Sequence, residues 1–206
     1  MQRPQPSRRP PTRPPQYRRP PTLLRCVVFT ILAIIILVGL AVLVTWLVIR
    51  PTKIEYAVEN ATITHYNLTS KDALNATFDV SLVAYNPNRR VSIYYEQVEF
   101  SVWYADQMVV SRGGEAFYQP RRNVTRLDFE AAAEGVRLMK GDVAVQMRRE
   151  RSGGRIYIEV KMKARVRFRV GSWRSKHYTM RVDCYPVTVR FGKKKAFERT
   201  DCEVDL

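Results

Sequence analysis

A row of cations on one side of a predicted strand is the clearest sign of binding chemistry in this sequence. In the segment KMKARVRFRV (161–170), apolar residues alternate with Lys161, Lys163, Arg165, Arg167 and Arg169. Side chains on one face of a strand recur every ~6.6–6.8 Å, so the five cations form a row about 27 Å long. Such a row suits nucleic acid, a membrane surface, an acidic polymer or an acidic protein. It is equally typical of the solvated face of a sheet. We hypothesise that it binds an acidic polymer such as pectate.

Residues that would carry catalysis do not form a recognisable motif. The two histidines are His65 and His177, and neither has Cys, His or Asp neighbours at metal-ligand spacing. There is no Gly-x-Ser-x-Gly elbow and no phosphate-binding or dinucleotide-binding loop, and the pairs Gly113–Gly114 and Gly153–Gly154 suit hairpins. We therefore expect a protein that is not an enzyme, with no catalytic residue, no metal and no cofactor.

Aromatic residues cluster just before the middle of the chain, and two interpretations apply to them. They line a sugar or lipid site, or they serve in core and cross-strand packing. The residues are Tyr94, Tyr95, Trp103 and Tyr104.

The apolar segment at residues 26–49 predicts a membrane helix. Its 24 residues, CVVFTILAIIILVGLAVLVTWLVI, contain no charge and would span about 36 Å as a helix. We interpret it as an uncleaved signal anchor. Arginines are concentrated before it, so the positive-inside rule places residues 1–25 in the cytosol and residues 50–206 outside the cell or in a secretory lumen.

The amino-terminal tail is rich in proline and arginine. Residues 1–25 hold eight of the twelve prolines and seven arginines, and the chain carries a formal charge of +16. This composition predicts a disordered segment with polyproline-II character. Its Pro11-x-x-Pro14 spacing resembles a ligand for a cytosolic partner with an aromatic groove, whereas the arginines by themselves suit a topology signal that contacts anionic lipid.

Two further features agree with an extracellular or lumenal location for residues 50–206. Four Asn-x-Thr sequons lie beyond the apolar segment and are candidate glycosylation sites: Asn60, Asn67, Asn75 and Asn123. Cys184 and Cys202 also lie beyond it and would form a disulfide in an oxidising compartment, the alternative being two free buried thiols. Cys26, at the cytosolic edge of the segment, is either an apolar thiol or a palmitoylation site.

Alternating apolar residues predict that residues 50–206 form an antiparallel β-sandwich of the fibronectin or immunoglobulin type. The stronger predicted strands lie at 74–84, 98–104, 156–170, 178–184 and 202–206. The strand at 178–184 continues at 187–191 beyond Pro186, which marks a bulge or an edge. Weaker strand candidates lie at 56–66, 107–111, 124–129 and 143–147. Turn residues separate them, including Asn86–Pro87–Asn88, where asparagine side chains cap the turn. The stretch FEAAAEGVRLMKG (129–141) is predicted to hold the only helix of this domain.

Several segments resemble one protein family in their order and spacing. FDVSLVAYNPNRRVSIYYEQVEFSVWY (78–104), FYQPRRNVT (117–125), and ARVRFRVG (164–171) followed by RVDC (181–184) are similar to the late embryogenesis abundant subgroup-2 domain, also called the water stress and hypersensitive response domain. With its tail and anchor, the chain looks like the plant harpin-induced-like and non-race-specific disease resistance-like membrane branch. It departs from the family at Pro120, where glycine is more usual. The resemblance implies a β-sandwich at the plasma membrane facing the apoplast, a role in defence or abiotic stress, and no catalytic residues.

Three functional hypotheses follow for the chain as a whole. The first is a membrane-anchored interaction protein whose outer domain binds cell-wall polymers or partner proteins, alone or in a homo- or hetero-oligomer. The second is a lipid-handling module at the plasma membrane, which an apolar cavity open at one end of the sandwich would favour. The third, a nucleic-acid binder, is opposed by the predicted topology, so we expect no nucleic acid partner.

Overall fold

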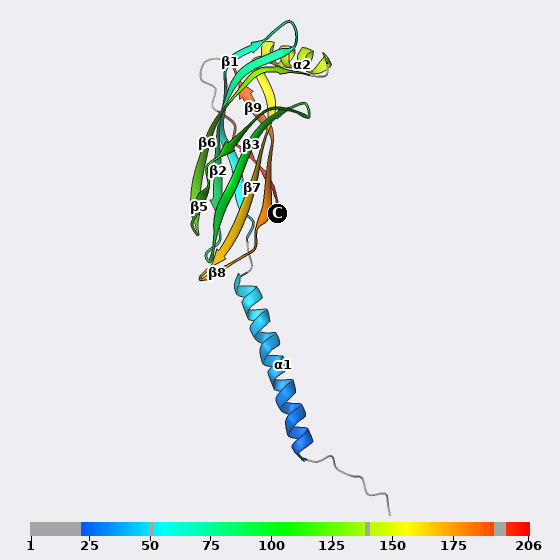
Figure 1. Cartoon of the computed structure of the whole chain (residues 1–206), viewed down its shortest axis with the longest axis vertical. Helices are drawn as coiled ribbons and strands as arrows, with labels where there is room; N and C mark the ends of the chain where they lie inside the picture. The colour runs from blue at the N-terminus through cyan, green and yellow to red at the C-terminus, as the bar shows by residue number, and fades with distance from the viewer. Residues whose placement is uncertain (1–21, 50–51, 139–140, 192–196) are drawn as a thin grey trace, which may run out of the picture. The chain divides into compact units, whose positions relative to one another are not determined.

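The computed structural model describes residues 22–49, 52–138, 141–191 and 197–206 (Figure 1). The chain divides into two compact units, residues 1–48 and 49–206. The first contains the amino-terminal helix and the second a β-sandwich with one further helix. The predictions made for the proline-rich tail, including its Pro11-x-x-Pro14 motif, lie outside the described residues.

The apolar segment forms the helix α1 (Thr22–Ile49), which begins before the predicted start at Cys26. Of the described part of the chain, Leu23–Val44 is the one stretch of helix long and apolar enough to cross a membrane. Thr30 satisfies its hydroxyl within the helix by donating to the Cys26 carbonyl oxygen at 2.8 Å. A polar side chain that bonds back to its own helix can be accommodated in an apolar segment.

The second unit consists of two antiparallel sheets, as predicted. One sheet has four strands in the order β10-β1-β2-β6, and the other has seven, five of them in the order β11-β9-β7-β3-β4, with β5 beside β3 and β8 beside β7. The strands of the first sheet are β1 (Glu55–Leu68), β2 (Ala73–Asn86), β6 (Asn123–Arg137) and β10 (Thr200–Asp201). Those of the second are β3 (Val91–Tyr104), β4 (Gln107–Gly114), β5 (Phe117–Gln119), β7 (Arg155–Val170), β8 (Trp173–Arg174), β9 (Tyr178–Arg190) and β11 (Glu203–Asp205).

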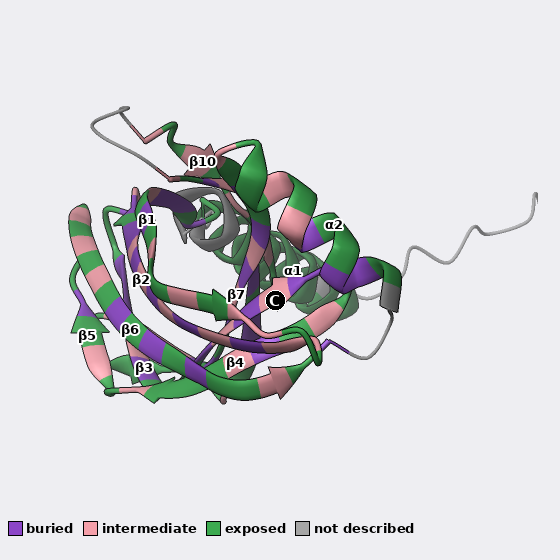
Figure 2. Ribbon diagram, turned by 90° about the horizontal axis from the view of Figure 1, so that it is seen from above, coloured by how far each residue is buried: buried purple, intermediate pink, exposed green. Residues whose placement is uncertain are grey.

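The core lies between the sheets and is built from alternate residues of each strand. Bands of buried residues alternate with exposed ones along the strands in Figure 2. In β7, Met162, Ala164 and Val166 are buried, as the alternation predicted. The rings of Phe100 from β3 and Phe129 from β6 stack with centroids 4.6 Å apart and join the two sheets. The stronger predicted strands are all present, and Pro186 lies at a shift of register between β7 and β9, as expected for a bulge.

Two predictions of secondary structure were wrong, and the first concerns residues 129–141. This alanine-rich stretch belongs mostly to β6, which pairs with β2 in the register Phe78↔Ala131. Ala131 and Ala133 are buried between exposed neighbours, a period of two that sheet pairing enforces over the helix propensity of alanine. Gly135 adopts φ +63° at an irregularity in this pairing.

The second wrong prediction is the weak strand candidate at 143–147, which lies in the helix α2 (Gly141–Ser152). Val143 and Met147, four residues apart, are both buried, so they lie on one face of a helix that packs on the core. The same residues also fit a period of two, because three apolar positions are too few to separate the two periods. The Arg148 guanidinium reaches Asp72 at 2.6 Å and ties α2 to the turn between β1 and β2.

The Asn86–Pro87–Asn88 turn is a buried hydrogen-bonding centre. Asn86 is fully buried, and its Nδ2 donates to the carbonyl oxygens of Val91 and Pro120, both at 2.9 Å. Its Oδ1 accepts from the backbone N–H of Asn88 at 3.1 Å, and Asn88 in turn bonds both backbone groups of Thr52 at 2.8 Å. The asparagines therefore cap the turn, as predicted, and also fasten it to two segments distant in sequence.

A second polar cluster holds β5 in the same region. Gln119 is fully buried, donates to the Ala84 carbonyl oxygen at 3.0 Å and accepts from the Tyr95 hydroxyl at 3.0 Å. The Tyr95 hydroxyl also lies 2.5 Å from that of Tyr56. Phe117 stacks on the Tyr95 ring at 4.1 Å. Phe117 and Gln119 thus have a structural role, because the ring of one and the amide of the other anchor the short strand β5.

The disulfide joins Cys184 in β9 to Cys202, which lies between β10 and β11. Cys202 also donates its backbone N–H to the Tyr56 carbonyl oxygen at 2.9 Å. The carboxy-terminal segment is therefore tied by one covalent bond and by pairing to both sheets. Cys26 is free and exposed in α1.

Candidate anion-binding face

The five predicted cations lie on β7, which is a central strand of the larger sheet, between β3 and β9. They alternate with apolar residues that are buried as far as Val166, so they lie on the outward face of that sheet. Lys163 and Arg165 are exposed, and Lys161, Arg167 and Arg169 are partly buried. A central strand has neighbours on both sides, so the charge environment of each cation depends on β3 and β9 as well as on β7.

Lys161, at one end of the row, is neutralised by the protein itself. Its Nζ lies 3.0 Å from Glu159 and 3.6 Å from Asp183, and 5.1 Å from the centre of the Trp103 ring. Partial burial lowers the pKa of this lysine, but the hydrogen bonds and charges of Glu159 and Asp183 outweigh it, so the pKa is raised. This end of the row carries little free positive charge.

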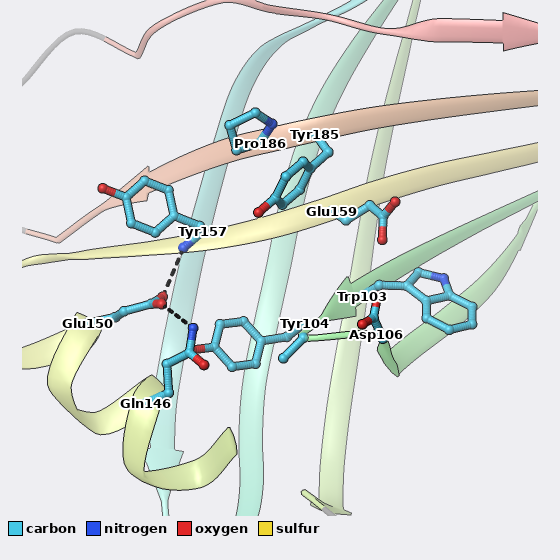
Figure 3. A pocket seen from close by; sticks show the side chains of 10 residues that line it. Trp103, Tyr104, Asp106, Gln146, Glu150, Tyr157, Glu159, Tyr185 and Pro186 are labelled. Atoms are coloured by element: carbon cyan, nitrogen blue, oxygen red, sulfur yellow. Dashed lines mark hydrogen bonds between the residues drawn. The ribbon is translucent and has the colours of Figure 1, made fainter. Parts of the chain in front are cut away.

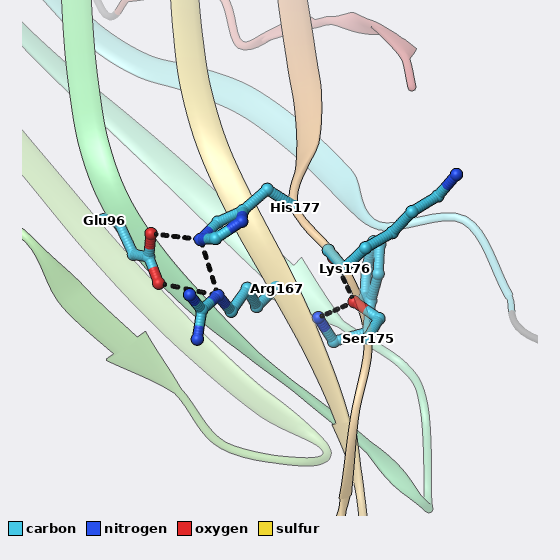
Figure 4. Close-up of polar contacts among 6 residues, drawn as sticks. Glu96, Arg167, Ser175, Lys176 and His177 are labelled. Carbon is cyan, nitrogen blue, oxygen red and sulfur yellow. Dashed lines mark hydrogen bonds and ion pairs between the residues drawn. The ribbon is translucent and has the colours of Figure 1, made fainter.

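Arg167 and Arg169, at the other end, are also engaged. The Arg167 Nε lies 3.0 Å from Glu96 and 2.6 Å from the Nε2 of His177, which itself lies 2.9 Å from Glu96 (Figure 4). Arg169 donates to the Tyr94 hydroxyl and to the Gly171 carbonyl oxygen, each at 3.0 Å. The two guanidinium groups are therefore held in place, and that of Arg169 has no carboxylate partner within the described part of the chain.

The middle of the row is the part with free charge. Lys163 and Arg165 make no ion pair or hydrogen bond through their side chains among the described residues, and neither does Arg181 of β9. Lys163 is the register partner of Arg181 on one side and of Glu99 on the other, and Glu99 accepts a hydrogen bond from Ser111 at 2.7 Å. Like charges directly opposite each other on a sheet are destabilising, so an anion bound here would relieve a repulsion.

An aromatic hollow adjoins the Arg167 end of this face. Its volume is about 410 Å³, and the rings of Tyr94 and Tyr118 lie 4.5 Å apart in its wall. The Arg174 guanidinium lies 5.8 Å from the centre of the Tyr94 ring, and Tyr118 is 45% exposed. Arg167 and its ion-pair partner Glu96 also line the hollow, so of the two guanidinium groups only that of Arg174 has no carboxylate partner among the described residues. A sugar ring that carries a carboxylate has an apolar face and an anionic group that match a ring face and this guanidinium.

The predicted aromatic cluster divides between the two interpretations. Tyr95 and Tyr104 are buried in the core, and Tyr94 and Trp103 lie partly exposed on the outward side of β3. Sequence reasoning missed Tyr118 and Arg174, because they belong to the short strands β5 and β8, which reach this hollow only by pairing with β3 and β7.

The remaining predicted sites lie away from this face. All four sequons lie on strands of the smaller sheet: Asn60 and Asn67 on β1, Asn75 on β2 and Asn123 on β6. Asn60 and Asn67 are exposed, and the side chain of Asn75 accepts a hydrogen bond from the Gly135 N–H at 2.7 Å. Among the described residues, no three or more His, Cys, Asp or Glu side chains gather in a way that would suit a metal ion.

Comparisons with known proteins identify the family. Residues 81–184 match the model described as "Late embryogenesis abundant protein" (LEA_2). An uncharacterised protein of Arabidopsis thaliana is 31% identical over 93% of this chain and 87% of its own length. In the same plant, NDR1/HIN1-like protein 3 is 29% identical over 87% of this chain and 80% of its own, and NDR1/HIN1-like protein 26 is 32% identical over 74% and 72%. The chain therefore belongs to the LEA_2 family and resembles its NDR1/HIN1-like members, as the spacing of its motifs predicted.

Proposed function

We propose that the protein is a membrane-anchored, non-enzymatic interaction protein whose outer domain binds acidic polymers through the outward face of β7. Its family supports a role in stress or defence responses, and the LEA_2 and NDR1/HIN1-like families are generally non-enzymatic. One apolar helix and one disulfide are compatible with a single-pass membrane protein that has a secreted domain. In this proposal α1 is a signal anchor in the plasma membrane, with the amino terminus in the cytosol and residues 50–206 in the apoplast.

The observation that carries the proposal is the excess of positive charge in the middle of the outward face, where three cations lie near one carboxylate, that of Glu99. Lys163, Arg165 and Arg181 are surface cations without a partner among the described residues, and two of them are direct cross-strand neighbours. A polyuronate presents a carboxylate on every sugar, so a single chain can contact several of these cations at once. Exposed charges are screened within about 8–10 Å at 0.1–0.15 M salt, so the binding must weaken as salt rises.

The aromatic hollow and the sequons fit the same proposal. The hollow with Tyr118 and Arg174 lies at one end of the cation row and would take one sugar of the polymer. The sequons lie on the other sheet, so glycans on them would leave the cation row uncovered. Glycosylation, a cytosolic partner of the proline-rich tail, and homo- or hetero-oligomers on the membrane are further parts of this proposal.

The test compares charge reversals on the outward face of the larger sheet with equal charge reversals elsewhere on the domain. The full-length chain in detergent micelles is titrated with an oligogalacturonate at low and at physiological salt. One variant combines Lys163→Glu, Arg165→Glu and Arg181→Glu, and the control combines Lys53→Glu, Lys71→Glu and Arg137→Glu, which change the net charge equally elsewhere. We expect the first variant to weaken binding by about 10- to 100-fold, since exposed charge contacts each contribute roughly 0.2–1 kcal/mol and six units of charge are changed. An equal loss in the control, or no loss in the first variant, would refute the proposal.

A lipid-handling role is the second candidate, and one hollow favours it. A space of about 520 Å³ opens between the edges of β4 and β6, with Phe100, Leu127 and Phe129 in its wall. Charged residues of both strands border it, including Arg112, whose guanidinium donates to the Glu130 carbonyl oxygen. This second function would be supported if the chain binds a fluorescent fatty acid and Phe129→Ala changes the affinity, while the charge reversals on β7 leave it unchanged.

A further inference from the structure

A second cleft on the sandwich has the opposite character to the cation face. It lies between α2, the turn that joins β3 to β4, and the bulge of β9, and its volume is about 630 Å³, within the range of small-molecule sites (Figure 3). None of its lining residues is a lysine, arginine or histidine, although the chain carries a formal charge of +16. Aromatic rings and carboxylates dominate the lining instead.

The aromatic wall comes from three different strands. Tyr157 of β7 and Tyr185 of β9 expose 38% and 67% of their surface, and Trp103 of β3 lies further along the cleft. Tyr185 stands beside the cleft because β9 bulges at Tyr185–Pro186, where its pairing with β7 shifts register. Exposed ring faces that surround one space attract cations through the negative charge of their π faces.

The carboxylates are placed on two sides of the same space. Glu150 of α2 is fixed by the Gln146 side chain at 2.9 Å and by the Tyr157 backbone N–H at 3.2 Å, as Figure 3 shows. Asp106 lies in the turn between β3 and β4, with φ +61°. Neither carboxylate has an ion-pair partner in the described part of the chain, so both keep an uncompensated negative charge beside the rings.

Tyr104, which also lines the cleft, forms part of its inner wall. The residue is 2% exposed, and its enclosed hydroxyl makes no hydrogen bond of full geometry among the described residues. Burial, together with the charge of Glu150 and hydrogen bonding toward its carboxylate, raises the pKa of this phenol and keeps it neutral. The neutral phenol therefore lies beside Glu150 without compensating its charge.

The protein already uses the same chemistry at the edge of this cleft. The ammonium group of Lys161 lies 5.1 Å from the centre of the Trp103 ring and 3.0 Å from the Glu159 carboxylate. One ring and one carboxylate therefore suffice here to hold an alkylammonium group. The inner part of the cleft offers two more rings and two more carboxylates, with no lysine of the described chain to occupy them.

We propose that this cleft binds an alkylammonium group. An ammonium is a compact cation with three hydrogen-bond donors and no acceptor, and it needs both aromatic faces and oxygen acceptors. Tyr157 and Tyr185 supply the faces, while Glu150 and Asp106 supply the acceptors. The group belongs either to a free aliphatic amine or to a lysine side chain of a partner protein. This site is separate from the acidic-polymer face and does not depend on it.

The test is calorimetric titration of the full-length chain in detergent micelles with three probes. Cadaverine represents a free amine, acetyl-Gly-Lys-Gly-amide represents a lysine side chain, and pentanol is the uncharged analogue. We expect the amine probes to bind and pentanol to bind at least about tenfold more weakly, since it lacks the charge. Combining Glu150→Gln with Asp106→Asn removes two charges of the cleft and is expected to weaken amine binding by at least about tenfold.

Two further variants separate a binding site from general electrostatics and from misfolding. Glu99→Gln removes one charge from the same sheet outside the cleft and is expected to change the amine affinity by less than about twofold. Tyr104→Phe keeps the ring and removes the enclosed hydroxyl beside Glu150, so it is expected to weaken amine binding less than the loss of both carboxylates does. Tighter binding of the peptide than of cadaverine would assign the ammonium to a partner protein, and tighter binding of cadaverine would assign it to a free amine. Failure of both probes to bind, or an equal loss with Glu99→Gln, would overturn the proposal.

Discussion

Replacing Asn86 with aspartate is the sharpest test of how this domain holds its long-range connections. Asn86 is fully buried, and its Nδ2 donates to the carbonyl oxygens of Val91 and Pro120, both at 2.9 Å. Asn86→Asp keeps the size of the side chain and its acceptor oxygen, but turns this donor into a second acceptor. Two buried carbonyl oxygens then face an oxygen instead of an N–H group, and a negative charge is placed in the interior.

The expected loss of stability follows from the two broken bonds. An unsatisfied buried polar group costs about 1–3 kcal/mol, and an uncompensated buried charge raises the total to about 3–5 kcal/mol. In a domain of this size, 1 kcal/mol shifts Tm by roughly 2–4 °C, so we expect Asn86→Asp to lower Tm by about 10–15 °C.

The pH dependence provides a second signature of the same mechanism. Burial and the two facing carbonyl oxygens must raise the pKa of the introduced carboxyl group in the folded state above its unfolded value of about 3.9. The unfolded chain therefore releases this proton first, and the extra destabilisation appears as pH rises above about 4. Below that value both states are protonated, one donated hydrogen bond can re-form, and the defect becomes smaller.

The assay is thermal unfolding of the full-length chain in detergent micelles, followed by near-ultraviolet circular dichroism between about pH 3.5 and 7. Asn67→Asp is the matched control, because Asn67 is exposed on β1 and the same atom is changed there. Subtracting the control removes the acid sensitivity common to both proteins. A loss in Asn86→Asp no greater than that of the control, or a defect that grows as pH falls, would refute this account of the turn.

Three other perturbations test separate parts of the fold. Gly114→Ala would place a Cβ atom 2.7 Å from an aromatic carbon of β3, whereas a Cβ atom at Gly113 would have no neighbour within 4 Å. In denaturant titrations we therefore expect Gly114→Ala to lower the free energy of unfolding by about 1–3 kcal/mol and Gly113→Ala to have little effect. Removing the Cys184–Cys202 disulfide, which closes a loop with a sequence separation of 18, is expected to cost about 3 kcal/mol, measured as a lower Tm of the double alanine variant. Burial raises the pKa of Tyr95 in the folded state, so the unfolded chain loses this proton first and the free energy of unfolding falls as pH rises above about 10. Tyr95→Phe removes the titrating group and should make this alkaline loss of stability less steep in equilibrium unfolding. An unchanged slope in the variant would contradict this explanation.

The alternation of apolar residues was sufficient to predict most of the strands, because one face of each strand has to be buried. In β7 buried residues alternate with less buried ones from 155 to 166, and both the core residues and the outward cations of this stretch were predicted correctly. The same rule failed at 129–141 and 143–147, where alanine propensity and a short apolar pattern gave the wrong element. Pairing with β2 decides the first of these segments, and packing of Val143 and Met147 on the core decides the second. Both causes are tertiary contacts.

The sequence by itself determined the family, the apolar helix, the two-sheet architecture and which face of β7 carries the cations, because each depends on composition or on local periodicity. Only the tertiary structure decided which of those cations are free. Glu96 and Asp183 lie on neighbouring strands, and their distances from Arg167 and Lys161 depend on strand register. The acidic cleft was not predicted at all, because its carboxylates and rings come from strands, a turn and a helix that are far apart in the chain. The position of a charged residue on a strand follows from the sequence, whereas its ion-pair partners depend on which residues are neighbours in space.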